Sequence, residues 1–179
     1  AVFTQNSLRE LINKSCDFEK IRAHRAKLFA CAYDINERHV KYFELKKLSD
    51  EEMTDAVLAS AAIPHVYDPV EIEGHKFADG GINDPSYGVK NSDVTPLSPL
   101  QDEGYDAIIV IHLREQETLD IDHIGPTRLI HIYPSKPLEQ IKGSGTMNFT
   151  RSAIRERFAM GYADMYIALG KLLMSIIKE

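Results

Sequence analysis

Three short runs of apolar residues occur along the chain, and segments of helical period lie between and after them. The runs cover residues 28–33, 107–111 and 129–133. Each is rich in β-branched or aromatic residues and is bounded by charged or turn-forming residues. Runs of this length and composition are typical of strands covered on both faces, as in a parallel sheet. We therefore expect three buried strands in a sheet of this kind.

A helix is predicted to begin just after Ser49. This serine and Glu52 have the spacing of a capping box, in which each side chain accepts a hydrogen bond from the backbone of the other residue. The apolar face of the helix is then formed by Met53, Ala56 and Val57. The helix should end before Pro64, because proline disfavours the helical conformation in the residue that precedes it.

The last long segment, from residue 150 to residue 178, predicts one amphipathic helix. Its apolar side chains recur at steps of three and four positions: Ile154, Phe158, Tyr162, Met165, Leu169, Leu172 and Ile176. The charged residues Arg155, Glu156, Arg157, Asp164 and Lys171 exclude a membrane span. A helix lying on a membrane surface is the alternative, but packing onto the sheet is favoured because the polar face is not markedly basic. Strands that alternate with helices predict an α/β layered fold.

Size and charge narrow the class of protein. A chain of 179 residues can bury one sizeable core, and its 27% of charged and 44% of hydrophobic residues exclude a disordered protein. The net charge is −6, without the basic patch that neutralises phosphates, so nucleic acid is not expected as a partner. No apolar run reaches the roughly 18 residues that a membrane span needs.

The two cysteines, Cys16 and Cys31, are too few for a disulfide framework or for a zinc site of their own. Cys31 lies inside an apolar run, where a buried free thiol is expected. Free thiols are typical of a reducing compartment, so we expect a cytoplasmic protein.

The most informative short motif is Asp79-Gly80-Gly81. An acidic residue follows a short extended segment, and two glycines follow it at once. Glycine permits positive φ and the close approach of another backbone, so a tight turn could display the Asp79 carboxylate at the edge of a sheet. The alternative is an ordinary Asp-Gly turn that closes a hairpin.

The sequence around this motif resembles the patatin-like phospholipase family. A helix end of sequence Ala-Ser-Ala-Ala-Ile-Pro at residues 59–64 precedes Asp79-Gly80-Gly81, as it does in that family. Further similar stretches occur in the family's order: residues 7–9 followed by 17–21, and then 29–35, 91–97 and 161–164. The similarity therefore extends over nearly all of the chain. It departs from the family at Thr95, which precedes Pro96, and at residues 85–90, which look inserted.

The resemblance implies a three-layer α/β/α patatin-like sheet and the hydrolysis of an acyl ester in a lipid by a Ser–Asp dyad. Asp79 is the residue that matches the family's catalytic aspartate, and Gly80 and Gly81 would let its turn approach the serine. A serine hydroxyl needs a base within hydrogen-bond reach before it becomes a good nucleophile. An ordinary Asp pKa of about 3.9 is low for a base, so partial burial should raise it. A lipid or ester substrate and transient contact with a membrane surface are the partners implied.

The family's nucleophile lies on a Gly-x-Ser-x-Gly turn, and this sequence contains no such pentapeptide. A glycine-rich oxyanion loop is also absent. Ser144 stands between glycines, but the spacing is wrong and no strand leads directly into it, so it is rejected as the nucleophile. We therefore expect residues 1–179 to be the C-terminal portion of a single patatin-like domain, with its sheet incomplete at the N-terminal side.

That portion is expected to be inactive alone, because losing a nucleophile costs about a million-fold in turnover. Its open sheet edge and exposed apolar surface would favour self-association. A non-catalytic binding or scaffolding module with the same fold is the alternative function. A nucleotide-binding domain is disfavoured, because no glycine-rich turn joins a strand to a helix.

Neither a metal nor another cofactor is expected. Residues 120–123, of sequence Asp-Ile-Asp-His, have a ligand-like composition, and His112 and His131 lie in or beside predicted strands. Alternation along a strand and charge on a solvated loop explain these residues without a metal. No pair has the spacing of a zinc site.

Overall fold

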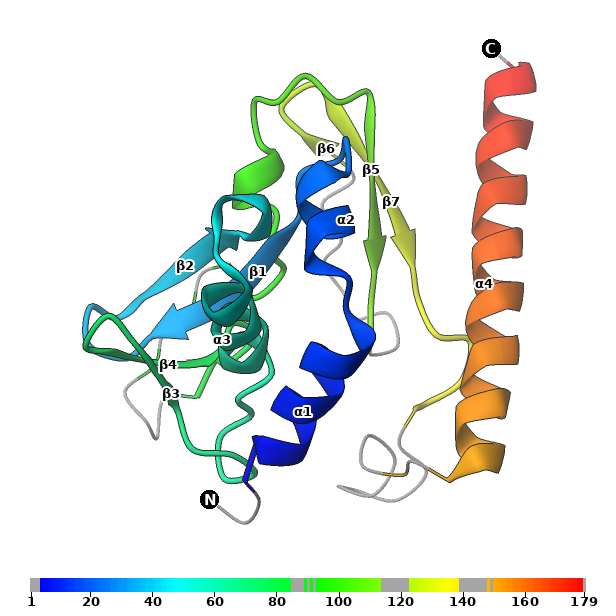
Figure 1. The fold of residues 1–179 in the computed structure, drawn as a ribbon. Coiled ribbons are helices and arrows are strands. Elements are labelled where there is room, and N and C mark those ends of the chain that lie inside the picture. The colour runs from blue at the N-terminus through cyan, green and yellow to red at the C-terminus, as the bar shows by residue number, and fades with distance from the viewer. Residues whose placement is uncertain are drawn as a thin grey trace. The chain divides into compact units, whose positions relative to one another are not determined.

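The computed structural model describes residues 4–84, 89, 91, 93–113, 123–138, 148 and 150–178. The chain forms two compact units, Ala1–Pro99 and Leu100–Glu179 (Figure 1). Helices and strands alternate along the chain, so the α/β class predicted from the sequence is confirmed. The assignment of residues 1–179 to one domain stays a prediction.

The first unit contains a four-stranded sheet of order β2-β1-β4-β3. Its strands are β1 (Phe29–Asp34), β2 (His39–Glu44), β3 (Val70–Ile72) and β4 (His75–Asp79). The predicted strand at residues 28–33 is confirmed as β1, none of whose residues is exposed. The parallel pairing expected for it is wrong, because β1 is antiparallel to both β2 and β4. Only four residues join β1 to β2, and a connection that short can return the chain only in the antiparallel direction.

Helix α3 (Asp50–Ser60) begins and ends where the sequence predicts. The Ser49 side chain accepts from the Glu52 backbone N–H, and the Glu52 carboxylate accepts from the Ser49 backbone N–H. The helix ends at Ser60, ahead of Pro64. Two shorter helices, α1 (Asn6–Ser15) and α2 (Phe18–Ala23), precede the sheet in the chain and were not predicted from the pattern.

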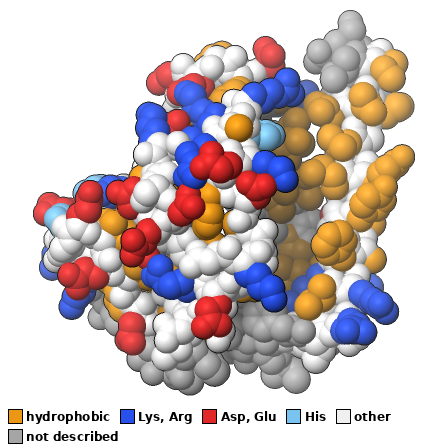
Figure 2. Space-filling view, in the orientation of Figure 1, with side chains coloured by type: hydrophobic (Ala, Val, Ile, Leu, Met, Phe, Trp, Pro, Cys, Tyr) orange, Lys and Arg blue, Asp and Glu red, His pale blue; other side chains and the backbone are white. Residues whose placement is uncertain are grey.

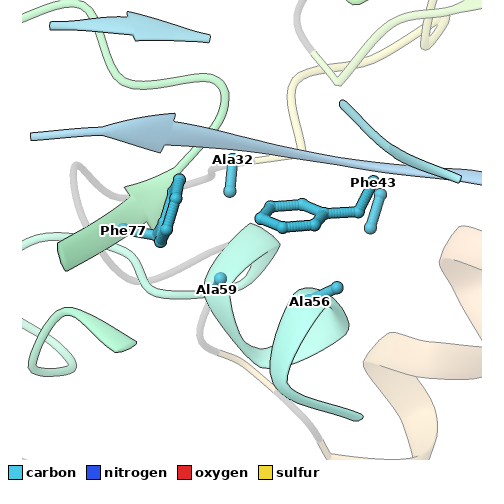
Figure 3. Close-up of a cluster of buried hydrophobic side chains, with 6 residues drawn as sticks. Ala32, Phe43, Ala56, Ala59 and Phe77 are labelled. Carbon is cyan, nitrogen blue, oxygen red and sulfur yellow. The ribbon is translucent and has the colours of Figure 1, made fainter. Parts of the chain in front are cut away.

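The core of the first unit lies between α3 and the sheet. Its buried cluster consists of Ala30, Ala32, Phe43, Ala56, Ala59 and Phe77. Figure 3 shows the rings of Phe43 and Phe77 beside the small alanines of β1 and α3. The two rings meet edge to face, with centroids 5.3 Å apart. Alanine at the contact positions lets the helix backbone approach the sheet closely, and the two phenylalanines fill the remaining space.

The second unit contains strands of order β5-β7-β6, namely β5 (Ala107–Ile111), β6 (His123–Ile124) and β7 (Thr127–Ile132). The predicted strands at 107–111 and 129–133 are confirmed as β5 and β7, and their predicted parallel pairing is confirmed as well. Coverage on both faces is not found for β5, in which every second residue is exposed. Such alternation is typical of a strand with one packed face.

The C-terminal segment forms one helix, α4 (Arg151–Lys178), as predicted. The expected packing of its apolar stripe onto the sheet is wrong for Phe158 and Tyr162, which are 80% and 71% exposed. Instead, the buried Asp164 carboxylate accepts a hydrogen bond from the Ser135 backbone N–H, which follows β7. This bond turns the Asp164 face of α4 toward β7 and leaves the aromatic face outside. Figure 2 shows the hydrophobic side chains along this helix.

None of the described helices combines the length and the apolar character required to cross a membrane.

Candidate active site

Asp79 is the last residue of β4, and its backbone is fixed on two sides. Its Cα is paired with that of Ala32 on β1, and its N–H donates to the Ala62 carbonyl, 3.0 Å away, just after α3. The Asp79 carbonyl accepts from Ile82 N–H at 3.1 Å, which closes a tight turn. The motif therefore lies at the end of a strand, with a helix end against it.

The Asp79 side chain also closes a smaller turn of its own. Its Oδ1 accepts a hydrogen bond of 2.7 Å from the Gly81 backbone N–H. Aspartate side chains commonly bond to the backbone two residues ahead in this way. The carboxylate is half-buried, and among the described residues it has no salt-bridge partner.

Burial raises the pKa of Asp79 above its ordinary value of 3.8, and the hydrogen bond from Gly81 opposes this rise. The direction expected from partial burial is therefore confirmed. A carboxylate that is desolvated without a cation is a stronger base than a solvated one. Its catalytic role stays a prediction at this point.

Gly80 is required for a steric reason. A Cβ at this position would lie 2.5 Å from both the carbonyl oxygen and the Sγ of Cys31, on the neighbouring strand β1. At Gly81, a Cβ would meet only the Asp79 Oδ1, at 3.1 Å. Positive φ, which glycine permits, is found at neither of these two glycines. The turn uses the small size of glycine rather than its backbone freedom.

Cys31 itself is not a reactive thiol. Burial raises its pKa to about 11, so almost none of it is thiolate at neutral pH. The thiol is free, as expected from the apolar run, but it is half-buried and not fully buried.

Asn91 was not assigned a role from the sequence, although it begins one of the stretches that resemble the family. Its side chain is buried, and Nδ2 donates a 2.7 Å hydrogen bond to the Gly80 carbonyl. Nearby, Asp93 accepts hydrogen bonds from Tyr42 on β2 and from Ser98. Asn91 thus lies directly against the turn that displays Asp79.

A second polar pair that sequence reasoning missed lies at the far end of β4. The Asp34 side chain is 3% exposed, and its Oδ2 is 2.7 Å from Nδ1 of His75. Burial tends to raise the pKa of Asp34. Hydrogen bonds from Glu37 N–H, His75 and Asn36 N–H outweigh that tendency, so the pKa is lowered overall. The pair joins the β1–β2 turn to the start of β4.

The structure brings together two of the histidines that were weighed as metal ligands. Nε2 of His112 lies 2.8 Å from Nδ1 of His131, and both rings stack on Tyr133. Residues 120–122, the side chain of His123 and Ser144 lie outside the described residues. Within the described part of the chain, no group of three His, Cys, Asp or Glu side chains could hold a metal ion.

Comparison with known proteins concerns the first unit. Residues 1–86 match the family model of the patatin-like phospholipases, a family of lipid hydrolases. The match runs from α1 through β4 and includes the whole Asp79-Gly80-Gly81 turn. No curated protein matches the chain. Over its first 86 residues, this chain is therefore similar to the patatin-like phospholipase family.

Proposed function

We propose that this chain supplies the general base, Asp79, of a lipid acyl hydrolase that works by a Ser–Asp dyad. The observation that carries the proposal is the state of the Asp79 carboxylate. It is half-buried at the end of β4, has its pKa raised by burial, and is held by the Gly81 N–H through Oδ1. Such a group is suited to remove a proton at neutral pH.

The chemistry follows from the two carboxylate oxygens. Oδ1 is engaged by Gly81, which leaves Oδ2 to accept the proton of a serine hydroxyl. As that proton moves to Asp79, the serine oxygen attacks the ester carbonyl carbon and forms an acyl-enzyme. The proton then passes to the departing alcohol. In a second step water attacks the acyl-enzyme while Asp79 takes its proton, and Asp79 then returns that proton to the serine oxygen as the fatty acid is released.

The serine must come from a segment with the family's Gly-x-Ser-x-Gly turn, which this sequence does not contain. We therefore propose that residues 1–179 form the C-terminal part of one three-layer patatin-like domain. The proposed substrate is a lipid or other acyl ester, reached by transient contact with a membrane surface from the cytoplasm. This chain by itself is expected to lack esterase activity.

The test is complementation. The chain is co-expressed with, or fused after, a family segment that carries the Gly-x-Ser-x-Gly turn, and hydrolysis of a p-nitrophenyl ester and of a phospholipid is measured. The complemented protein should be active, and Asp79→Asn should lower turnover on the order of 10⁴-fold. Asp102→Asn is the matched control, because it makes the same change on an exposed residue with positive φ, which asparagine tolerates.

Activity that survives Asp79→Asn in the complemented protein would rule out the dyad. A complemented protein that binds lipid but hydrolyses no ester would instead favour the non-catalytic binding module.

A further inference from the structure

The peptide group between Gly80 and Gly81 is bonded at both of its ends. Its carbonyl oxygen accepts the 2.7 Å hydrogen bond from Nδ2 of Asn91, and its N–H donates the 2.7 Å hydrogen bond to Oδ1 of Asp79. A peptide group is planar, and its C=O and N–H point in opposite directions. An anchor on the carbonyl therefore determines where the N–H points.

Asn91 is itself held in one orientation. Its Oδ1 accepts from Asp93 N–H at 2.8 Å, and its own backbone N–H donates to Asn83 Oδ1 at 3.3 Å. With a donor at Oδ1 and an acceptor at Nδ2, only one orientation of the carboxamide satisfies both bonds. Asn91 is 6% exposed, so water cannot readily replace its side chain.

Asp93 joins this anchor to the sheet. It accepts a hydrogen bond from the Tyr42 hydroxyl on β2, and Tyr42 is paired with Cys31 on β1. Cys31 in turn lies against Gly80, on the strand next to β4. The Gly80–Gly81 peptide is thus fixed by steric contact with β1 and by a hydrogen bond from Asn91.

We propose that Asn91 is a positioning residue, whose carboxamide fixes the Gly80–Gly81 peptide and thereby holds the Gly81 N–H against the Asp79 carboxylate. The importance of this arrangement for catalysis rests on the proposed function of Asp79. The structural coupling from Asn91 to Asp79 does not depend on that proposed function. Hydrogen bonds in such a chain also polarise one another, so each one strengthens the other.

The coupling is measured by NMR on the 179-residue chain. In the wild-type protein, the Gly81 amide proton should shift downfield as Asp79 ionises, because its acceptor becomes charged. The side-chain amide protons of Asn91 should titrate at the same midpoint through the shared peptide. Both titrations should vanish in Asp79→Asn. This test needs no substitution at residue 91. If the side-chain amide protons of Asn91 do not titrate together with the Gly81 amide proton in the wild-type protein, the inference is wrong.

The variant Asn91→Ala removes the anchor. We expect the Gly81 amide to lose most of its pH-dependent shift. We also expect the pKa of Asp79 to rise further, because the hydrogen bond that lowers it is weakened. Asn91→Asp, which keeps the size but removes the donor, should reduce the Gly81 shift in the same way. Unchanged Gly81 titration in a folded Asn91→Ala protein would contradict the proposal.

Asn36→Ala is the matched control. Asn36 Oδ1 accepts from Lys76 N–H at 2.8 Å, so the control removes a similar side-chain bond to β4 but at its other end. It should leave the Gly81 titration as in the wild type. In the complemented enzyme, Asn91→Ala should lower kcat while KM changes little. If the complemented enzyme is inactive but the Asn91 and Gly81 amide protons still titrate together, the proposed Ser–Asp dyad is refuted and the positioning role of Asn91 is not.

Discussion

The carbonyl oxygen of Cys31 lies where a side chain on Gly80 would have to begin, 2.5 Å from an ideal Cβ. The two residues are brought together by the pairing of β1 with β4, and no local feature of either sequence stretch requires the contact. Gly80, the second residue of the Asp-Gly-Gly motif, is therefore required by the packing of this turn against β1. Asp79 is the last residue of β4, and the turn that follows it can pass this close to β1 only because Gly80 has no side chain.

Gly80→Ala should destabilise the first unit by about 1–3 kcal/mol, because the obstructing atom is backbone and cannot rotate away. The free energy of unfolding in urea measures the loss. Gly81→Ala should cost less, since its Cβ meets only the movable Asp79 side chain. Adding Cys31→Ala to Gly80→Ala removes the sulfur contact but not the carbonyl contact. Full recovery of stability in that double variant would show that the sulfur was the obstacle.

Asp79→Asn should raise the free energy of unfolding at neutral pH. The folded-state pKa of Asp79 is raised above the unfolded value, so ionisation destabilises the folded state at pH values above the unfolded pKa of about 3.8. Asparagine removes that charge and still accepts from Gly81 through Oδ1. The gain should be present at pH 7 and disappear as pH falls below that value, as measured by urea unfolding. If Asp79→Asn is less stable than the wild-type protein at pH 7, the ionised Asp79 carboxylate stabilises the folded state, and the expectation is wrong.

Asp34 should give the opposite dependence on pH. Its folded-state pKa is lowered below 3.8, so its contribution is fully present above that pH. The contribution is lost as pH falls from 3.8 through the folded-state value. Wild-type protein should therefore be more stable than Asp34→Asn at pH 6, and the difference should narrow in strong acid. A difference that stays constant from pH 6 to pH 2 would show that the charge of Asp34 is not what stabilises the turn.

The exposed aromatic face of α4 should promote self-association. Phe158, Tyr162 and Tyr166 are between 71% and 80% exposed on one side of the helix. Sedimentation should show association that grows with protein concentration, and Phe158→Glu should shift it toward monomer. Gln101→Glu adds the same charge on an exposed turn outside α4 and should have little effect. A wild-type protein that stays monomeric over a wide concentration range would contradict this expectation.

The relation of sequence to structure differs from element to element. The capping box at Ser49 predicts the start of α3 because its hydrogen bonds join residues three apart. The apolar run at 107–111 and the helical period of 150–178 predict β5 and α4 for a similar reason, since both patterns are local properties of the sequence. The direction in which β1 pairs is not local. A buried apolar run is compatible with either direction, and the short connection to β2 decided it.

By itself, the sequence determined the α/β class, the strands β1, β5 and β7, the helices α3 and α4, the similarity to the patatin-like family and Asp79 as the candidate base. Each of these follows from residues that are neighbours in the chain or from a contiguous motif. Only the tertiary structure decided that Gly80 lies against Cys31, that Asn91 holds the Gly80 carbonyl, and that Asp34 meets His75. These contacts join residues between 11 and 49 positions apart. Their free energy depends on packing and burial, which no spacing along the chain can encode.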